Sequence, residues 1–512
     1  MASNFEELSD ADPGRLRRAS YRILACFVFT CVYFTGVYPG AADSNQRSHF
    51  QLLRALAERG TAEIGPEIRD LGTHTDVSVY AGRSYSDKAP GLSVAAIPGY
   101  RAMRLFLPMP SSLDDWLVFY GARVLSVTLV VTLALAVFVR RAPSHPLLPL
   151  WLFALLFATP FAVYARSFFS HAFVAGLLFL SFALLSRGES RAAAAGAGFL
   201  AGAGVASEYP VVVIALCLTA LAIARPSMAR LSLFAAGAAI PAALLLGYQA
   251  RYFGGPFHFP ATFNQTYPIL AHRGVGGISW PSPSAILGLF FDPSHGLLYF
   301  SPFLILWPVV AVGSLRRIRR DPSLLATALG PLLLVLLIAG FLPPHWRGGW
   351  CLGPRYLVAG FLLVFWLLAN RGRLANRPAA RLLLLAAVVY AAAIVTVCGA
   401  TYWMIPYSSW NPARTVSAHF LKVGLVEFNL GVAAGLSPRL SLLPPLAAAA
   451  IAFFAMLRAL PFPKRVLAAA TLAGLLAAAA VVAIRPSAAA IENSHRDGLA
   501  SVLLPSMRPG WR

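Results

Sequence analysis

The sequence predicts an all-α, polytopic membrane protein in which residues 1–512 form a single integral membrane domain. Hydrophobic residues make up 58% of the chain and charged residues only 12%. Such a composition leaves too little polar surface for a water-soluble domain. A helix needs about 20 mostly apolar residues to cross a bilayer. About thirteen runs approach this length, at 21–38, 117–139, 146–164, 168–186, 192–207, 209–225, 230–250, 297–315, 323–342, 354–369, 381–402, 442–459 and 465–484.

Arginine clusters predict how these runs are oriented. The chain has a net charge of +22, and its basic residues gather in alternate connections between the apolar runs. Basic residues favour the cytoplasmic side of a membrane. Thirteen spans then place the N-terminal tail, residues 1–20, in the cytoplasm and the C-terminal tail, residues 486–512, in the periplasm. This distribution favours contact with membrane lipid and argues against a nucleic-acid partner.

The loop 39–116 is the first long connection on the outer side. A cleaved signal peptide is a second interpretation of the run before it, because Gly40-Ala41-Ala42 has the small residues of a cleavage site. The run is long for a signal peptide, so a membrane span is favoured. In the loop, apolar residues recur at helical spacing from residue 46 until Gly60, which predicts an amphipathic helix in the membrane interface. A second, less regular helix is predicted over residues 90–106.

Asp43 opens this loop, five residues past the first apolar run. A carboxylate at the membrane surface is a candidate general base. The other interpretation is a solvated acid or the N-cap of the following helix. The base and cap roles can coexist.

Lys88 is one of only three lysines, against 39 arginines. A lysine kept in so arginine-rich a chain suggests a site for a compact ammonium charge, such as one that meets a phosphate. Chance is the alternative.

Three further ionisable residues lie at the outer ends of predicted spans: Arg166, His171 and Glu208. They are candidate supporting residues, with a solvated turn as the alternative. A carboxylate so close to hydrocarbon is costly unless it is paired. We therefore expect Glu208 to have an arginine or lysine partner.

The segment 345–356 is the densest polar and aromatic stretch of the chain. Arg347 and Arg355 lie beside glycines that allow close backbone approach, which suits a phosphate. His345 and Tyr356 are candidate supporting residues. The aromatic residues are also typical of an interfacial belt. The turn 292–296, by contrast, is expected to be structural.

These features together resemble the polytopic GT-C glycosyltransferases, in particular bacterial relatives of protein O-mannosyltransferases and lipid A aminoarabinose transferases. The resemblance rests on one span, an outer aspartate, a helix that ends in glycine and a Lys-x-Pro element, together with the span count. It also rests on three segments, Ser86-Asp87-Lys88-Ala89-Pro90-Gly91, Gly296-Leu297-Leu298-Tyr299-Phe300-Ser301-Pro302 and Gly348-Gly349-Trp350-Cys351-Leu352-Gly353-Pro354-Arg355-Tyr356.

The resemblance implies a function in the inner membrane of a bacterium. The donor would be a polyprenyl-phosphate sugar, the acceptor a hydroxyl of a glycan, lipid or protein, and transfer would invert the anomeric carbon. Asp43 would match the catalytic aspartate and Lys88 the lysine that binds the donor phosphate. Ser44 replaces the glutamate that often follows the aspartate, and Ala89 interrupts the usual Lys-Pro-Pro. No cofactor is implied, and a divalent metal stays open.

A transporter or lipid-linked sugar flippase is the main alternative. Transporters often carry ionisable residues and broken helices near the middle of the membrane, whereas the charges of this chain lie at the outer ends of its apolar runs. An inactive scaffold of an envelope complex is a third interpretation. The five cysteines show no metal-ligand spacing and are interpreted as buried thiols.

Overall fold

The computed structural model describes residues 12–36, 43–107, 112–143, 145–186, 190–224, 227–266, 277–341, 345–371, 378–484, 487, 491–493 and 497. The predicted tail up to residue 11, the segment Gly40-Ala41-Ala42 and most of the predicted tail 486–512 lie outside these residues. The described chain is predominantly helical, and its sheet has two strands. The predicted all-α class is confirmed.

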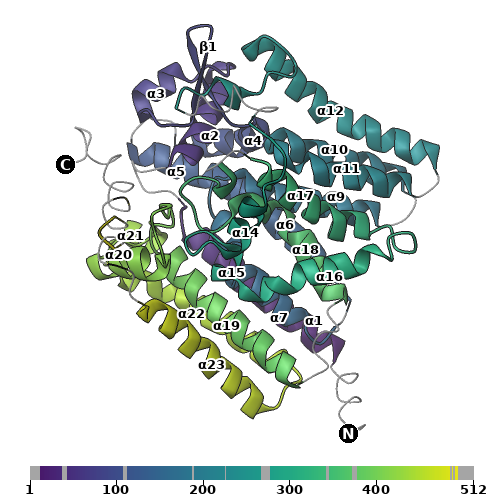
Figure 1. Cartoon of the computed structure of the whole chain (residues 1–512). Coiled ribbons are helices and arrows are strands. Elements are labelled where there is room, and N and C mark those ends of the chain that lie inside the picture. The colour runs from purple at the N-terminus through teal and green to yellow at the C-terminus, as the bar shows by residue number, and fades with distance from the viewer. Residues whose placement is uncertain are drawn as a thin grey trace.

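Helices form a bundle that fills most of the molecule (Figure 1). Each of the thirteen predicted runs contains helix, and an unpredicted apolar helix, α14 (Pro283–Phe291), precedes the eighth. The helices in these runs are α1 (Pro13–Tyr33), α5 (Ser112–Arg123) continuing into α6 (Leu129–Arg141), α7 (Leu148–Phe157), α8 (Phe161–Tyr164), α9 (Ser170–Leu185), α10 (Arg191–Ser207), α11 (Val212–Ile223), α12 (Met228–Phe253), α15 (Leu297–Phe300), α16 (Leu306–Leu315), α17 (Gly330–Ala339), α18 (Phe361–Arg371), α19 (Pro378–Ala400), α22 (Leu443–Ala459) and α23 (Lys464–Ala483).

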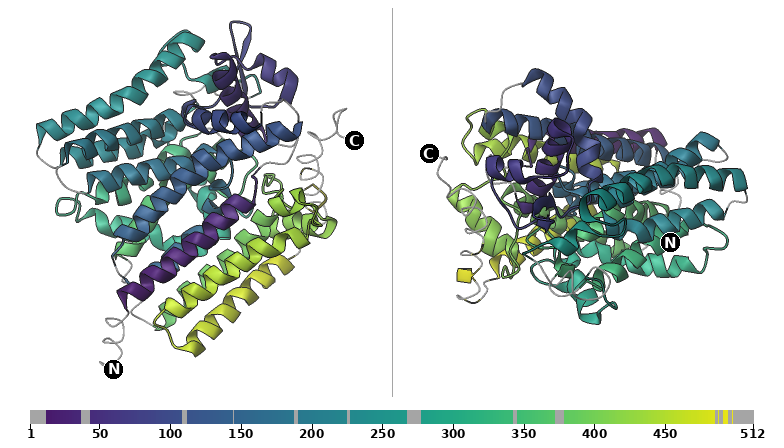
Figure 2. Two further views of the ribbon diagram at one scale, coloured as in Figure 1. Left: turned by 180° about the vertical axis from the view of Figure 1, so that it is seen from behind. Right: turned by 90° about the horizontal axis from the view of Figure 1, so that it is seen from above.

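Five helical segments among the described residues are long and apolar enough to cross a membrane by themselves: Asp115–Arg141, Met228–Phe253, Ala379–Ala400, Leu440–Ala459 and Lys464–Ala483. The number of thirteen spans stays a prediction. Helix α1 lies between α6 and the C-terminal helix α22 and packs against both (Figure 2). The first predicted run ends earlier than expected, because α1 stops at Tyr33 and Phe34 forms an isolated bridge with Asn429.

The Ala- and Gly-rich run 192–207 forms α10, which packs along α12. Gly198 lies against the backbone of Phe234, and Gly237 lies against that of Ala195. A Cβ atom at either glycine would clash with a carbonyl oxygen. Small residues let helix backbones approach closely in membranes, so the composition of this run supports a tightly packed helix pair.

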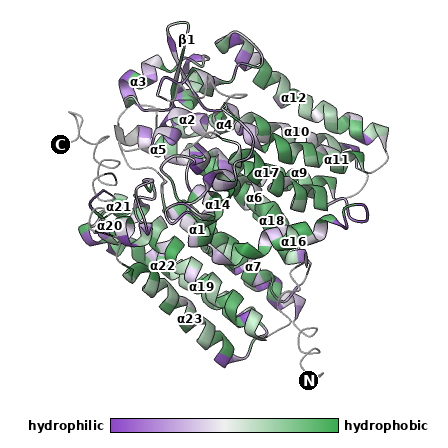
Figure 3. Ribbon diagram, in the orientation of Figure 1, coloured by the Kyte–Doolittle hydropathy of each residue, from purple (hydrophilic) through white to green (hydrophobic). Residues whose placement is uncertain are grey.

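Many of the hydrophilic residues lie at the side of the bundle away from the start of α1 (Figure 3). The loops 39–116 and 403–441 contain α2 (Ser44–Arg54) with its π-helical extension Ala55–Arg59, α3 (Gly65–Leu71), β1 (Val77–Tyr80), β2 (Arg83–Ser86), α4 (Gly91–Phe106), α20 (Ala418–Val423) and α21 (Leu430–Ala433). Both helices predicted in the loop 39–116 are confirmed as helices, whereas α3 and the strands were not predicted.

Helix α2 begins at the cap Asp43 and its π-helical extension ends at Gly60, whose φ of 65° is left-handed. Its polar face is covered by protein, since Ser48 and Gln51 are fully buried and α2 packs on α4 and β2. The predicted helix is therefore present, but lipid headgroups do not cover its polar side.

The strands β1 and β2 form an antiparallel hairpin whose register pairs Val77 with Ser86. Ala81 and Gly82 link the strands with φ values of 48° and 74°, as two-residue hairpin turns require. Asp76 and Asp87 extend the register by one pair, and the backbone nitrogen of Asp87 donates to the carbonyl of Asp76 (3.5 Å). The hairpin thus brings two carboxylates together just before Lys88.

Candidate active site

Asp43 lies at the N-terminus of α2 and is 8% exposed. Its Oδ1 accepts a hydrogen bond from the backbone nitrogen of Gln46 (3.0 Å), and its Oδ2 accepts one from Gln46 Nε2 (2.6 Å). The cap role is therefore confirmed. Burial raises the pKa of Asp43 and outweighs the hydrogen bonds from Gln46 and the charge of Arg355, which lower it. A raised pKa makes the carboxylate a better proton acceptor.

Gln46 fixes Asp43 to two predicted spans. Its Nε2 also donates to the carbonyl of Gly36 (2.9 Å), just past α1, and its Oε1 accepts from the backbone nitrogen of Phe168 (2.7 Å), just before α9. Gly36 in turn lies so close to the carbonyl of Arg166 that a Cβ atom there would clash. The aspartate is thus held at the point where the end of α1 meets the start of α9.

Lys88 is bound between the two aspartates of the hairpin. Its Nζ lies 2.8 Å from Asp76 Oδ2 and 3.0 Å from Asp87 Oδ1. We call Asp76, Lys88 and Asp87 the Lys88 cluster. Two carboxylates against one ammonium leave the cluster with one negative charge in excess. Lys88 is therefore paired with two carboxylates, and its predicted contact with a phosphate stays a prediction.

The Lys88 cluster has perturbed proton affinities. Burial raises the pKa of Asp87 to about 6, against the opposing charge of Lys88. Burial also acts to raise the pKa of Asp76, but Lys88 lowers it overall. The two carboxylates outweigh burial and raise the pKa of Lys88. Near neutral pH, Asp87 is therefore the member that gains or loses a proton.

Arg355 is a buried guanidinium that lacks a carboxylate partner among the described residues. It lies over the rings of Phe169 (5.5 Å) and Tyr356 (5.1 Å), and its Nη2 donates to the Tyr356 hydroxyl (3.3 Å). Its Nε has no hydrogen-bond partner. Its charge lowers the pKa of Asp43 and of Asp76, so it lies within electrostatic range of both. A buried, unpaired cation is costly, and an anionic ligand would remove that cost.

Arg347 differs from Arg355 although the sequence suggested the same role for both. Its Nη2 forms an ion pair with Asp292 Oδ2 at 3.0 Å. Asp292 also accepts from the backbone nitrogens of Ser294 (2.8 Å) and His295 (3.2 Å), which confirms the structural turn. His345 lies in the same short helical turn as Arg347, and burial lowers its pKa.

Glu208 pairs with a histidine, so the predicted arginine or lysine partner is wrong. His171 Nδ1 lies 2.8 Å from Glu208 Oε1, and Ser170 Oγ donates to Glu208 Oε2 (3.2 Å). His171 is the second residue of α9 and Glu208 is the C-cap of α10, and these two helices pack together. The ring of Tyr356 lies across that of His171, with centroids 5.5 Å apart. The pair is therefore beside Arg355.

The structure thus brings Asp43, Lys88, Arg355, Tyr356 and the pair of His171 with Glu208 into one region, and it places Arg347 and His345 in a neighbouring cluster. No group of three or more His, Cys, Asp or Glu side chains suited to a metal occurs in the described parts of the chain.

No protein-family model matches the chain, and no curated protein sequence matches it. Two crystal structures of ArnT from Cupriavidus metallidurans are similar in structure. One, bound to undecaprenyl phosphate, has 17% sequence identity and a TM-score of 0.47, with 91% of this chain and 78% of that chain covered. The other, in the apo state, has 18% identity and a TM-score of 0.45, with 88% and 75% covered. Both belong to the group that the sequence resembles.

Arg166 lies on the other side of Gly36 and forms a buried ion pair. Its Nη2 lies 2.6 Å from Glu427 Oε2 and also donates to the carbonyl of Gly399. Its guanidinium stacks over the ring of Phe34 at 4.1 Å. Burial raises the pKa of Glu427 against the charge of Arg166. The ion pair links the segment that follows α20 to the end of α19. This role is structural.

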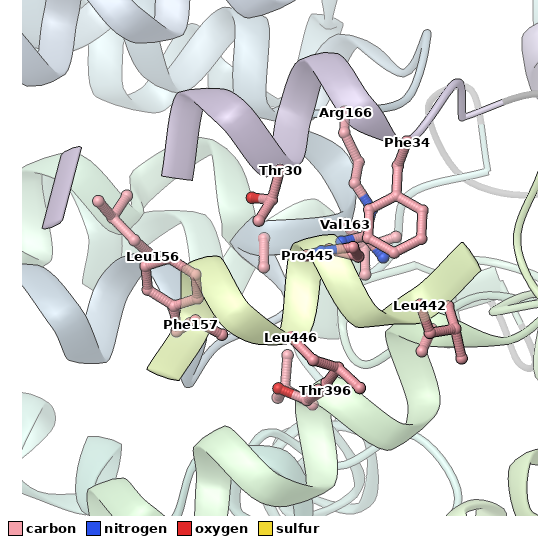
Figure 4. Close-up of a pocket in the computed structure, with 14 residues that line it drawn as sticks. Thr30, Phe34, Leu156, Phe157, Val163, Arg166, Thr396, Leu442, Pro445 and Leu446 are labelled. Atoms are coloured by element: carbon pink, nitrogen blue, oxygen red, sulfur yellow. The ribbon is translucent and has the colours of Figure 1, made fainter. Parts of the chain in front are cut away.

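A small apolar pocket of ≈ 50 Å³ begins at Arg166 and Phe34 and runs between α1, α7, α19 and α22 (Figure 4). It is lined by Thr30, Phe34, Leu156, Phe157, Ala162, Val163, Arg166, Val395, Thr396, Ala400, Leu442, Pro445, Leu446 and Ala449.

Replacing Arg166 by methionine is expected to lower the free energy of unfolding by about 3–5 kcal/mol, because it leaves a carboxylate buried without its cation. The loss should be smaller at acid pH. Glu427 without its partner takes up a proton on folding, so the stability of the variant falls as the pH rises. Thermal unfolding in detergent at two pH values measures both effects. The double variant R166M/E427Q should recover much of the loss; if it is as unstable as R166M, the ion pair is not the cause.

Sequence reasoning missed Asp76, Asp87, Glu427 and His49 as members of these clusters. Burial lowers the pKa of His49 to about 3, so this residue of α2 is neutral beside the site. In the sequence, Asp76 and Asp87 lie on the two sides of a turn that contains Gly82. A hairpin predicted around this turn would have placed the two aspartates opposite each other. Glu427 carried no local signal, because its partner is 261 residues away.

Proposed function

We propose that the chain is a membrane glycosyltransferase that moves a sugar from a polyprenyl-phosphate donor to an acceptor hydroxyl at the outer face of the membrane. Asp43 is the general base, and Arg355 binds the donor phosphate. The chain lies in the inner membrane of a bacterium with its N-terminus in the cytoplasm. The loop 39–116 then faces the periplasm and carries the chemistry.

The burial of Arg355 without a carboxylate partner is the observation that carries this proposal. A guanidinium presents N–H donors in a planar fork that matches phosphate oxygens. Its Nε is buried and has no partner, so it is available to a ligand. Charge that develops on a departing phosphate is stabilised by such a preorganised cation. The arginine therefore supports the binding of a phosphate-linked donor.

Asp43 supports the transfer step. The acceptor hydroxyl must lose its proton as it attacks the anomeric carbon, and a buried carboxylate with a raised pKa accepts that proton. The electrostatic influence of Arg355 on Asp43 is consistent with a phosphate and a base on the two sides of one sugar. Inversion follows from a single displacement in this geometry.

The polyprenyl chain requires an apolar surface near the phosphate. The apolar residues that line the small pocket between α1, α7, α19 and α22 offer such a surface, and Arg166 at this pocket lies next to Gly36. Gly36 is joined to Asp43 through Gln46. We propose that the start of the lipid chain lies against these helices.

Lys88 contributes to donor binding only when the negative charge of its two carboxylate partners is reduced. As the pH falls through about 6, Asp87 gains a proton and the Lys88 cluster loses its excess negative charge. Wild-type protein should therefore bind the anionic donor several-fold more tightly at about pH 5.5 than at about pH 7.5, within the limit of about tenfold per pH unit for one proton.

The variant D87N should bind the donor at about pH 7.5 as wild type does at about pH 5.5, with little change between the two. Scintillation proximity with radiolabelled donor measures both affinities. An unchanged pH dependence in D87N would remove Asp87 from this role. The donor is a phosphodiester, so its own charge does not change over this range.

Transfer of label from radiolabelled polyprenyl-phosphate sugars by the purified protein in lipid tests the function. A membrane extract serves as the acceptor pool, and heat-treated protein is the control. Label recovered in a new covalent product supports the transferase. Label that crosses the bilayer of proteoliposomes on an unchanged lipid would instead establish the flippase. The proposal would be overturned if neither transfer nor transport of label were detected with a full set of donors and the protein did not bind undecaprenyl phosphate.

A further inference from the structure

The imidazole of His171 is 3% exposed, and only one of its two nitrogens has a partner. Nδ1 contacts Glu208, while Nε2 is buried and has no hydrogen-bond partner. A buried polar atom left unsatisfied costs free energy that a ligand can recover. The buried, unpaired nitrogen is therefore a position where a hydrogen-bond donor would lower the free energy, and the proposed mechanism does not use it.

Glu208 determines which kind of group Nε2 can bind. Ser170 donates to one oxygen of the Glu208 carboxylate, and the other oxygen faces His171 Nδ1. A carboxylate accepts hydrogen bonds, so Nδ1 carries the proton of a neutral imidazole and Nε2 presents a lone pair. A lone pair binds a hydroxyl or amine donor and rejects a phosphate oxygen.

His171 and Arg355 lie on the same aromatic residues. The imidazole centroid is 5.8 Å from Phe169 and 5.5 Å from Tyr356, and the Arg355 guanidinium lies over both rings. A second buried cation beside Arg355 would be repelled, which favours the neutral imidazole. Tyr164 closes a third side at 5.5 Å.

We propose that His171 Nε2 accepts a hydrogen bond from a ring hydroxyl of the transferred sugar and so selects which sugar the protein uses. This inference rests on the proposed function. A sugar bonded to a phosphate at Arg355 lies next to that phosphate, and the imidazole is its polar neighbour. The aromatic rings around it supply apolar surface for the carbon face of the sugar. Glu208 is the positioning residue, because it holds the imidazole with its lone pair toward the sugar.

Comparing a bare lipid with glycosylated lipids tests this assignment. The probes are undecaprenyl phosphate and its mannose, glucose and arabinose conjugates, and the readout is the dissociation constant of each. In H171F a ring still fills the space but carries no nitrogen. It should bind the preferred conjugate about tenfold or more weakly, which is the effect of one unmet buried hydrogen bond, and should bind undecaprenyl phosphate as wild type does. H171Q keeps an amide oxygen that can accept, so it should retain part of the affinity.

The outcomes separate the two proposals. Wild-type protein that binds none of these lipids overturns the proposed function itself. Binding of undecaprenyl phosphate by wild type, with equal weakening of bare and glycosylated lipids in H171F, places His171 at the phosphate and overturns the sugar contact. If H171F binds the glycosylated donor as wild type does, with or without a raised KM for the acceptor, the proposed sugar contact is also overturned.

A second measurement uses only wild-type protein, in case H171F does not fold. Mono-deoxy analogues of the preferred sugar, each lacking one ring hydroxyl, are compared as donors. One analogue should lose about tenfold or more in affinity, because it leaves Nε2 unsatisfied. Equal affinity for every analogue contradicts the proposal.

Discussion

Replacing Asp43 by asparagine is expected to lower the rate of sugar transfer by about 10²–10⁴-fold, the usual contribution of a positioned general base. The loss should appear in kcat, because asparagine cannot accept the acceptor's proton, whereas the donor contacts at Arg355 are unchanged. Initial rates with radiolabelled donor, together with donor affinity measured separately, test both parts.

The structure offers a clean control for this substitution. Asp43 also caps α2, and asparagine caps a helix as well as aspartate does. D43N thus removes the base and keeps the Oδ1 cap, but its Nδ2 cannot accept the hydrogen bond that Gln46 Nε2 donates to Asp43 Oδ2. D43A removes the base and the cap and should also lose about 1 kcal/mol of stability. A D43N protein that transfers sugar at the wild-type rate would exclude Asp43 as the base.

Replacing Arg355 by glutamine is expected to weaken donor binding by about 10–100-fold, because a charge-assisted hydrogen bond contributes about 1.5–3 kcal/mol. R355K should weaken binding too, since lysine keeps the charge but lacks the planar fork. Removing Arg355 leaves no described carboxylate without its partner, so the fold should hold. Equilibrium binding of undecaprenyl phosphate measures the effect.

Arg347 provides the matched control. R347Q leaves Asp292 without its cation at a side-chain exposure of 9%, so it should lower the melting temperature and leave donor affinity close to wild type. R355Q should show the opposite pattern. If both variants lose donor affinity equally, the two arginines share the phosphate and the distinction drawn between them is wrong.

Local patterns were sufficient for much of the fold. The apolar runs predicted the positions of the bundle helices, and the spacing of apolar residues up to Gly60 predicted α2 and its end. Burial of the polar face of α2 could not be predicted, because the hairpin and α4 that cover it lie further along the chain. The hairpin itself was missed because its four-residue strands show little alternation.

The sequence predicted individual residues of the candidate site but not which side chains form ion pairs with one another. Asp43 and Arg355 stood out from their surroundings in the sequence. That Lys88 lies between two aspartates depends on the register of the hairpin, and that Glu208 meets His171 depends on how α9 packs against α10. Ion pairs of this kind are set by tertiary contact, so sequence context suggested an arginine or lysine where the structure has a histidine.

The Lys88 cluster also bears on how a reaction cycle would end. The proposed donor is a phosphodiester with one negative charge, whereas the polyprenyl phosphate that transfer would release is a monoester that carries about −1.5 to −2 at pH 7. The cluster has one negative charge in excess, so it repels the spent lipid more strongly than the donor. Each transfer would thereby add negative charge to the lipid phosphate, and the Lys88 cluster would repel the polyprenyl phosphate that remains. Since product release limits many enzymes, the two aspartates that weaken donor binding would shorten the time for which the site stays blocked.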